Sequence, residues 1–167
     1  LYLTYQLGEI TLNGYGDFAR GIEIAADNCG IRGLYIKNFY DYGVYIHQGS
    51  NNCYLERNAL NANGTGLYSQ GDNFALFNNY IGLHPTNALA EGNEKYGVEL
   101  DGNGGSITVS IGEDGGNFIC SNGGSGLYAH GAVNITAQDN YFGTIENHNI
   151  MLPNGTSYGV GSGAWLD

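Results

Sequence analysis

A short pattern of apolar and polar positions recurs along the chain and predicts repeated β-strands. In each case a glycine is followed by an apolar residue and then by alternation, the period of a strand with one buried face. The sites are Gly21-Ile22-Glu23, Gly43-Val44-Tyr45, Gly66-Leu67-Tyr68, Gly97-Val98-Glu99, Gly126-Leu127-Tyr128 and, more weakly, Gly159-Val160-Gly161. Their intervals of 22, 23, 31, 29 and 33 residues predict a solenoid, whose turns bury their apolar faces against one another.

A second triplet, an asparagine followed by two mostly apolar residues, lies between the glycine sites. It occurs at Asn38-Phe39-Tyr40, Asn58-Ala59-Leu60, Asn79-Tyr80-Ile81, Asn117-Phe118-Ile119 and Asn140-Tyr141-Phe142. We expect these asparagines to form an internal ladder, with side-chain amides bonding from rung to rung and to corner backbone. Parallel strands without helical crossovers predict an all-β, right-handed parallel β-helix of about six rungs.

The whole chain, residues 1–167, is expected to be one β-helix domain. Its parts are an opening turn over 1–20, repeats over 21–158 and a terminal strand over 159–167. Insertions follow Asn79-Tyr80-Ile81-Gly82 and Asn140-Tyr141-Phe142-Gly143, at corresponding places in two rungs.

Two long stretches of this chain are similar to a known family. The runs NNYIGLHPTNALAEGNEKYGVEL and SIGEDGGNFICSNGGSGLYAHGAVNITAQDNYFGT resemble right-handed parallel β-helix repeats of large secreted bacterial proteins. The resemblance covers roughly residues 21 to 160 and implies an extracellular or cell-surface location. It implies no single function, because such repeats occur in adhesins, surface fibres and carbohydrate-active enzymes.

The composition agrees with a folded solenoid. The chain has 29 glycines, 21 asparagines and only 2 prolines, without the three-residue glycine period of collagen. A hydrophobic content of 42%, with 14 Tyr and 6 Phe, argues against disorder. Glycine and asparagine tolerate positive φ, so the Asn-Gly pairs are expected at tight corners. These pairs begin at Asn13, Asn63, Asn103, Asn122 and Asn154.

The charge excludes several partners. The net charge is −11, and the fixed cations are Arg20, Arg32, Lys37, Arg57 and Lys95. Nucleic acid binding requires clustered Lys and Arg, so neither DNA nor RNA is expected as a partner. Anionic membranes and polyanionic glycans are disfavoured for the same reason. No apolar run approaches 18 residues, so membrane insertion is not expected.

Cysteine and acidic motifs predict neither a metal nor a cofactor. Cys29 and Cys53 lie about one rung apart, which leaves open two small inward residues or a disulfide, and Cys120 has no evident partner. No Cys-x-x-Cys or Cys/His metal spacing occurs. Acidic pairs such as Asp72-Asn73 and Glu113-Asp114 lack the ligand spacing of a calcium loop.

The strand period assigns side chains to the two faces of the repeated sheet. Residues one and three after each signature glycine are expected inside, and residues two and four outside. The inner positions are Ile22/Ile24, Val44/Ile46, Leu67/Ser69, Val98/Leu100 and Leu127/Ala129. The outer columns are Glu23, Tyr45, Tyr68, Glu99 and Tyr128, and Ala25, His47, Gln70, Asp101 and His130.

This outer face contains the candidate site, for which three interpretations stand. Tyr45, Tyr68, Gln70, Tyr128 and His130 are candidates for ligand binding, around Glu99 and Asp101. Two carboxylates at i and i+2 lie ~7 Å apart on a strand, near the lower end of the separation in inverting glycosidases. The strip could therefore cleave a neutral glycan or bind one without cleavage. The third interpretation, which the strand preference of tyrosine favours, is a plain tyrosine-rich surface or a packing interface.

The motif content favours a structural or adhesive extracellular solenoid over an enzyme. Pectin-type hydrolases on this fold have Asn-Thr-Asp, Asp-Asp and Gly-His-Gly signatures, and the related lyases place Arg or Lys beside metal-binding acids. None of these patterns stands in this sequence. The alternatives are a carbohydrate-active β-helix protein, glycan-binding or glycoside-cleaving, and a phage tailspike fragment.

The two ends predict assembly. The segment from Leu1 is strand-like and lacks a cap, and Trp165 and Leu166 stand at the other end. Leu1 and Leu3 of one subunit could pack on Trp165 and Leu166 of the next, giving a head-to-tail surface filament. A piece cut from a longer solenoid is the alternative.

Overall fold

The computed structural model describes residues 10–86, 89–112, 115–144, 151–155 and 163–167, the side chains of 103–107 excepted. Within these ranges the protein consists of β-strands and turns, with no helix, and therefore none that could cross a bilayer. The strands are β1 (Ile10–Asn13), β2 (Arg20–Ile24), β3 (Gly30–Arg32), β4 (Leu34–Lys37), β5 (Tyr42–Ile46), β6 (Tyr54–Glu56), β7 (Ala59–Asn61), β8 (Thr65–Ser69), β9 (Phe74–Phe77), β10 (Tyr80–Ile81), β11 (Val98–Ile111), β12 (Phe118–Ile119), β13 (Leu127–Ala137), β14 (Tyr141–Phe142) and β15 (Ala164–Leu166).

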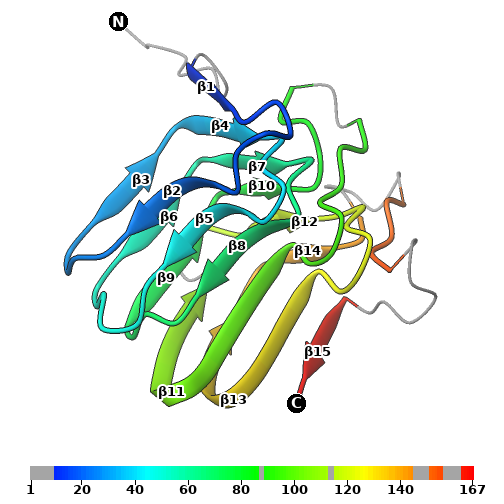
Figure 1. Ribbon diagram of the computed structural model, residues 1–167. Helices are drawn as coiled ribbons and strands as arrows, with labels where there is room; N and C mark the ends of the chain where they lie inside the picture. The colour runs from blue at the N-terminus through cyan, green and yellow to red at the C-terminus, as the bar shows by residue number, and fades with distance from the viewer. Residues whose placement is uncertain (1–9, 87–88, 113–114, 145–150, 156–162) are drawn as a thin grey trace, which may run out of the picture.

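The strands form two parallel sheets. The six-stranded sheet has the order β1-β4-β7-β10-β12-β14. The nine-stranded sheet follows β2-β5-β8-β11-β9-β6-β3, with β13 beside β11 and β15 beside β13. In the first half of the chain each strand pairs with the third strand after it, so the chain repeatedly returns alongside itself (Figure 1). We call the stretch between one strand and the strand that pairs with it, which corresponds to one predicted rung, a coil.

The nine-stranded sheet curls because its two halves merge in β11. The first residues of this strand pair with β8 and its last residues pair with β9, although β8 and β9 are successive strands of one coil. A register shift between Gly102 and Ile107 accompanies the bend. The expectation of an all-β protein with parallel strands is thus confirmed for the described residues.

The predicted inner face of the repeated sheet is also confirmed. Val98 pairs with Leu67 on one side and with Leu127 on the other, and all three side chains are buried. Apart from Ile22, which is partly buried, all the predicted inner residues are buried, and even Ser69 is completely covered. Burial of this continuous apolar column is the main favourable contribution to folding.

The signature glycines are required by close approach between coils. A Cβ on Gly66 would lie 2.6 Å from the carbonyl oxygen of Gly97, and one on Gly97 would lie 2.6 Å from that of Gly126. Any larger residue would push neighbouring coils apart. One position differs from the prediction. Gly163 completes this column, since Leu127 donates its N–H to the Gly163 oxygen at 3.0 Å, and the predicted Gly159 lies outside the described residues.

An asparagine ladder connects successive coils, as expected. The backbone N–H and Nδ2 of Asn58 both donate to Oδ1 of Asn79, at 2.9 and 3.2 Å. Asn79 does the same to Asn117, and Asn117 to Asn140. The assignment of Asn38 to this ladder was wrong. The N–H that donates to Asn58 Oδ1 belongs to Leu34, and Asn38 occupies a corner with φ of 60°.

A second ladder corrects the interpretation of the Asn-Gly pairs. Asn63, Asn93, Asn122 and Asn154 bond from coil to coil through the same pair of contacts. Three of these asparagines begin Asn-Gly pairs, which were expected at positive-φ corners. None of them has a positive φ, because each side chain is directed inwards to satisfy buried backbone groups.

We predict that Asn79→Ala destabilises the fold by about 3 kcal/mol or more. The substitution removes the acceptor of the buried Asn58 N–H and the donor to the Leu55 and Phe77 oxygens, leaving several buried groups unsatisfied. Asn51→Ala is the control, because that side chain donates only one long bond of 3.3 Å, at the surface. Urea unfolding should give a change within about 0.5 kcal/mol for the control. Equal losses in the two variants would contradict the ladder's role.

Candidate functional site

The seven predicted site residues lie together on the outer face of the nine-stranded sheet. We call them the acidic strip: Tyr45, Tyr68, Gln70, Glu99, Asp101, Tyr128 and His130. They come from β5, β8, β11 and β13 and the residue following β8. The strand register places Tyr68 beside Tyr45 and Glu99, and Asp101 beside His130. The predicted outer columns are therefore confirmed as neighbours in space.

Hydrogen bonds connect one half of the acidic strip. The Tyr68 hydroxyl donates to Oδ2 of Asp101 at 2.6 Å, and Gln70 Nε2 donates to the same oxygen at 3.0 Å. The Tyr45 hydroxyl in turn donates to Gln70 Oε1 at 3.2 Å. Two side chains thus converge on one carboxylate and Tyr45 joins them through Gln70, so that four side chains from three strands and one turn are held in fixed relative positions.

His130 lies between the two carboxylates. Its Nε2 is 3.7 Å from Glu99 Oε1, and its Nδ1 is 3.6 Å from Asp101 Oδ1. Both distances exceed a normal hydrogen bond, so the contacts are electrostatic and strengthen when the imidazole is protonated. The imidazole is therefore within ion-pair distance of both acids.

The faces of the tyrosine rings in the strip are covered by neighbouring side chains. Tyr45 and Tyr68 stack with centroids 5.1 Å apart and planes 9° apart. The Arg20 guanidinium lies 4.3 Å from the Tyr45 centroid, and Tyr128 stacks on Tyr96 at 4.7 Å. A ligand would therefore meet ring edges and hydroxyl groups rather than open ring faces.

The strip is less exposed than its outward direction predicts. The side chains of Glu99 and Asp101 are only 17% and 11% exposed. The physical reason is the close spacing of parallel strands, ~4.8 Å, which brings the long neighbouring side chains over the two carboxylates. An outward position on a strand predicted the direction of these side chains correctly but not their burial.

Burial changes the proton affinities at the strip. It raises the pKa of Glu99 above the usual 4.5, because the charged form is desolvated, although His130 and Lys95 oppose the shift. Burial also raises the pKa of Tyr68 far above its usual value, and the hydrogen bond to Asp101 adds to this effect. Tyr68 is therefore a proton donor to Asp101 at every physiological pH.

The residues predicted for assembly are only partly described. Trp165 and Leu166 lie on β15 with exposed side chains, and the Trp165 ring meets the Tyr128 ring edge-on at 6.4 Å. Leu1 and Leu3 fall outside the described residues. The proximity of Trp165 to the strip was not predicted, because it depends on the pairing of β15 with β13.

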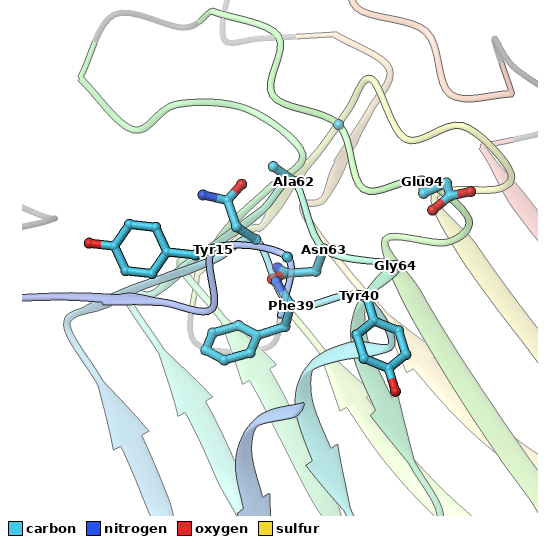
Figure 2. Close-up of a pocket in the computed structure, with 10 residues that line it drawn as sticks. Tyr15, Phe39, Tyr40, Ala62, Asn63, Gly64 and Glu94 are labelled. Carbon is cyan, nitrogen blue, oxygen red and sulfur yellow. The ribbon is translucent and has the colours of Figure 1, made fainter. Parts of the chain in front are cut away.

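A hollow of about 430 Å³ was missed by the sequence analysis (Figure 2). It is lined by Tyr15, Gly16, Asn38, Phe39, Tyr40, Ala62, Asn63, Gly64, Gly92 and Glu94. Figure 2 shows Tyr15 and Glu94 at opposite sides of it. The rings of Tyr15 and Tyr40 are 78% and 55% exposed. Four separate turns form its wall, so only the recurrence of corners at the repeat interval could have indicated it.

Metal binding receives no support from the described part of the chain. No three side chains of His, Cys, Asp or Glu gather there in an arrangement that could hold an ion. The three cysteines are free thiols.

Comparison with known proteins identifies no relative. No family model, no curated protein and no solved structure matches this chain.

We predict that Glu99→Gln raises the free energy of unfolding relative to wild type, and that this gain is larger at neutral pH than at acid pH. A folded-state pKa above 4.5 means that the native state holds the proton of Glu99 more tightly than the unfolded state does. The wild type therefore loses stability as the pH rises from the unfolded-state pKa of Glu99 through its folded-state pKa. Glutamine abolishes this loss. Urea unfolding at pH 4 and pH 7 should show the variant gaining on wild type at the higher pH. Glu94→Gln, at an exposed carboxylate outside the strip, is the control. A gain no larger than the control's would contradict the prediction.

Proposed function

We propose that this chain forms a right-handed parallel β-helix. The parallel pairing of every third strand, the stacking of identical columns and the two asparagine ladders support a continuous coil. The right hand follows from the right-handed twist that L-residues impose on strands and on parallel crossover connections. Each of the long strands β11 and β13 then corresponds to two successive strands of one coil, joined without a break at the corner between them.

This solenoid serves as an extracellular structural and adhesive element at a cell surface. A rigid body suits that role, and the ladders supply rigidity because each coil is fixed to the next at two corners. The acidic surface, with a net charge of −11, favours solubility and disfavours anionic partners. The resemblance to repeats of secreted bacterial proteins points to the same location.

The acidic strip is the adhesive surface, and its ligand is a neutral glycan. The observation that carries this proposal is the single connected network of Tyr45, Gln70, Tyr68 and Asp101 on one outer face. Its hydroxyl, amide and carboxylate groups are already held in place, and ordered polar groups bind sugar hydroxyls at little entropic cost. Because the ring faces are occupied, recognition takes place by hydrogen bonds at the ring edges.

Cleavage of the glycan is the alternative at the same residues. The acids Glu99 and Asp101 would serve as general acid and base. The contacts of His130 with both acids favour binding without cleavage, since the carboxylates are already engaged by a side chain of the protein. Release of reducing ends from a bound polysaccharide would decide for cleavage, and that activity should then disappear in Glu99→Gln.

The test is retention on columns of immobilised neutral glucan, mannan and galactan. The variant Tyr45→Phe/Tyr68→Phe keeps the stacked rings and removes two hydroxyl groups of the network. At about 1 kcal/mol for each hydrogen bond, retention should weaken roughly tenfold or more on the column that holds the wild type.

The matched control is Tyr15→Phe/Tyr40→Phe, which removes two hydroxyl groups beside the hollow. Its retention should equal that of the wild type. If only this control variant lost retention, the ligand would bind at the hollow and not at the acidic strip. Absence of wild-type retention on all three columns would reject glycan binding.

A further inference from the structure

Cys29 and Cys53 occupy equivalent positions in two consecutive coils. Each directly precedes a strand, β3 and β6, and these strands pair in parallel with Gly30 opposite Tyr54. The Tyr54 N–H donates to the Cys29 carbonyl oxygen at 2.9 Å. Parallel neighbours stand ~4.8 Å apart, within the Cα separation that a disulfide requires. The backbone therefore places the two cysteines side by side on neighbouring coils.

The two thiol groups also share one environment. The Cys53 thiol donates to the Ala26 oxygen at 3.4 Å, and the Cys29 thiol contacts the Asp27 oxygen at 3.6 Å. Both sulfur atoms thus lie against the same turn, at the adjacent carbonyl oxygens of Ala26 and Asp27.

The unequal exposure of the two thiol groups determines which of them reacts first. Cys53 is completely buried, whereas Cys29 packs against the core from a partly open position. Burial raises the pKa of Cys53, which disfavours its thiolate. A reagent in solution therefore reaches Cys29 first, and Cys53 reacts second.

We propose that Cys29 and Cys53 form a reversible disulfide that joins the first two coils. With a small disulfide such as oxidised glutathione as the oxidant, the Cys29 thiolate attacks one sulfur and releases one glutathione thiolate. The Cys53 thiolate then attacks the Cys29 sulfur and releases the second. Two protein thiols are oxidised, one glutathione disulfide is reduced to two thiols, and the two protein protons pass to the released glutathione thiolates.

The bond would close a loop between residues 24 positions apart and hold β2, β3, β5 and β6 in register. Restricting the unfolded chain in this way should raise the Tm by roughly 6–12 °C. The proposal is independent of glycan binding, because neither cysteine contributes to the acidic strip.

The experiment treats the folded wild-type chain with oxidised glutathione, removes the reagent, and maps the bonds by digestion and mass spectrometry beside a thermal unfolding scan. A peptide pair that joins Cys29 to Cys53, a Tm raised as above, and reversal of both by dithiothreitol are expected. Cys120→Ala should behave as wild type, because Cys120 is buried at the other end of the molecule and bonds to Thr144. Cys29→Ser should lose both effects.

Two results would overturn the proposal. One is a stable glutathione adduct on Cys29 without the internal bond. The other is formation of the bond with an unchanged or lowered Tm, which would mean that the link strains the coils and does not stabilise them.

Discussion

The structure depends on how the buried peptide groups at the corners between strands find hydrogen-bond partners. At each of these corners a backbone N–H points towards the neighbouring coil, where no strand can receive it. The side-chain oxygen of an asparagine one coil further along accepts that bond, and the Nδ2 group of the same side chain donates to backbone carbonyl oxygens, as Asn79 does for Asn58, Leu55 and Phe77. An unsatisfied buried group costs about 1–3 kcal/mol, so each ladder position stabilises the coil on both sides of it.

Equal spacing between coils follows from the ladders and from the glycine column. Gly66 and Gly97 bring successive backbones so close that no side chain fits between them. The strands consequently stack in register, and like positions form columns inside and outside the sheet. The acidic strip is a product of this stacking, since Tyr68, Glu99 and Asp101 meet only because their strands are aligned residue for residue. The geometry of this surface is thereby tied to packing at the corners.

Sequence patterns predicted those columns because strand alternation is local and in-register stacking carries it from coil to coil. Val98 and Glu99 were assigned to the correct faces from one glycine alone. Other features depend on contacts that no local pattern encodes. Asn38 donates one side-chain bond to Asn13 of the preceding coil from a left-handed corner, whereas Asn63 makes the pair of bonds that defines a ladder, because asparagine suits both environments.

Burial and concavity were the least predictable properties. The low exposure of Asp101 arises from Tyr68 and Gln70, which belong to the preceding coil. The hollow beside Tyr15 and Tyr40 is formed by turns that lie far apart in the sequence. In both cases the decisive neighbours are more than twenty residues away, and their side-chain lengths rather than their pattern determine the outcome.

Amide hydrogen exchange at the ladder tests the central claim most directly. The backbone N–H groups of Asn58 and Asn79 each donate to a side chain and not to a strand. If the ladders hold the coils together, these amides exchange as slowly as those inside β5 and β8, through global unfolding. The N–H of Asn73, bonded to the neighbouring Asp72 side chain at an exposed corner, is the fast reference. Exchange of Asn58 and Asn79 at the rate of Asn73 would contradict the account.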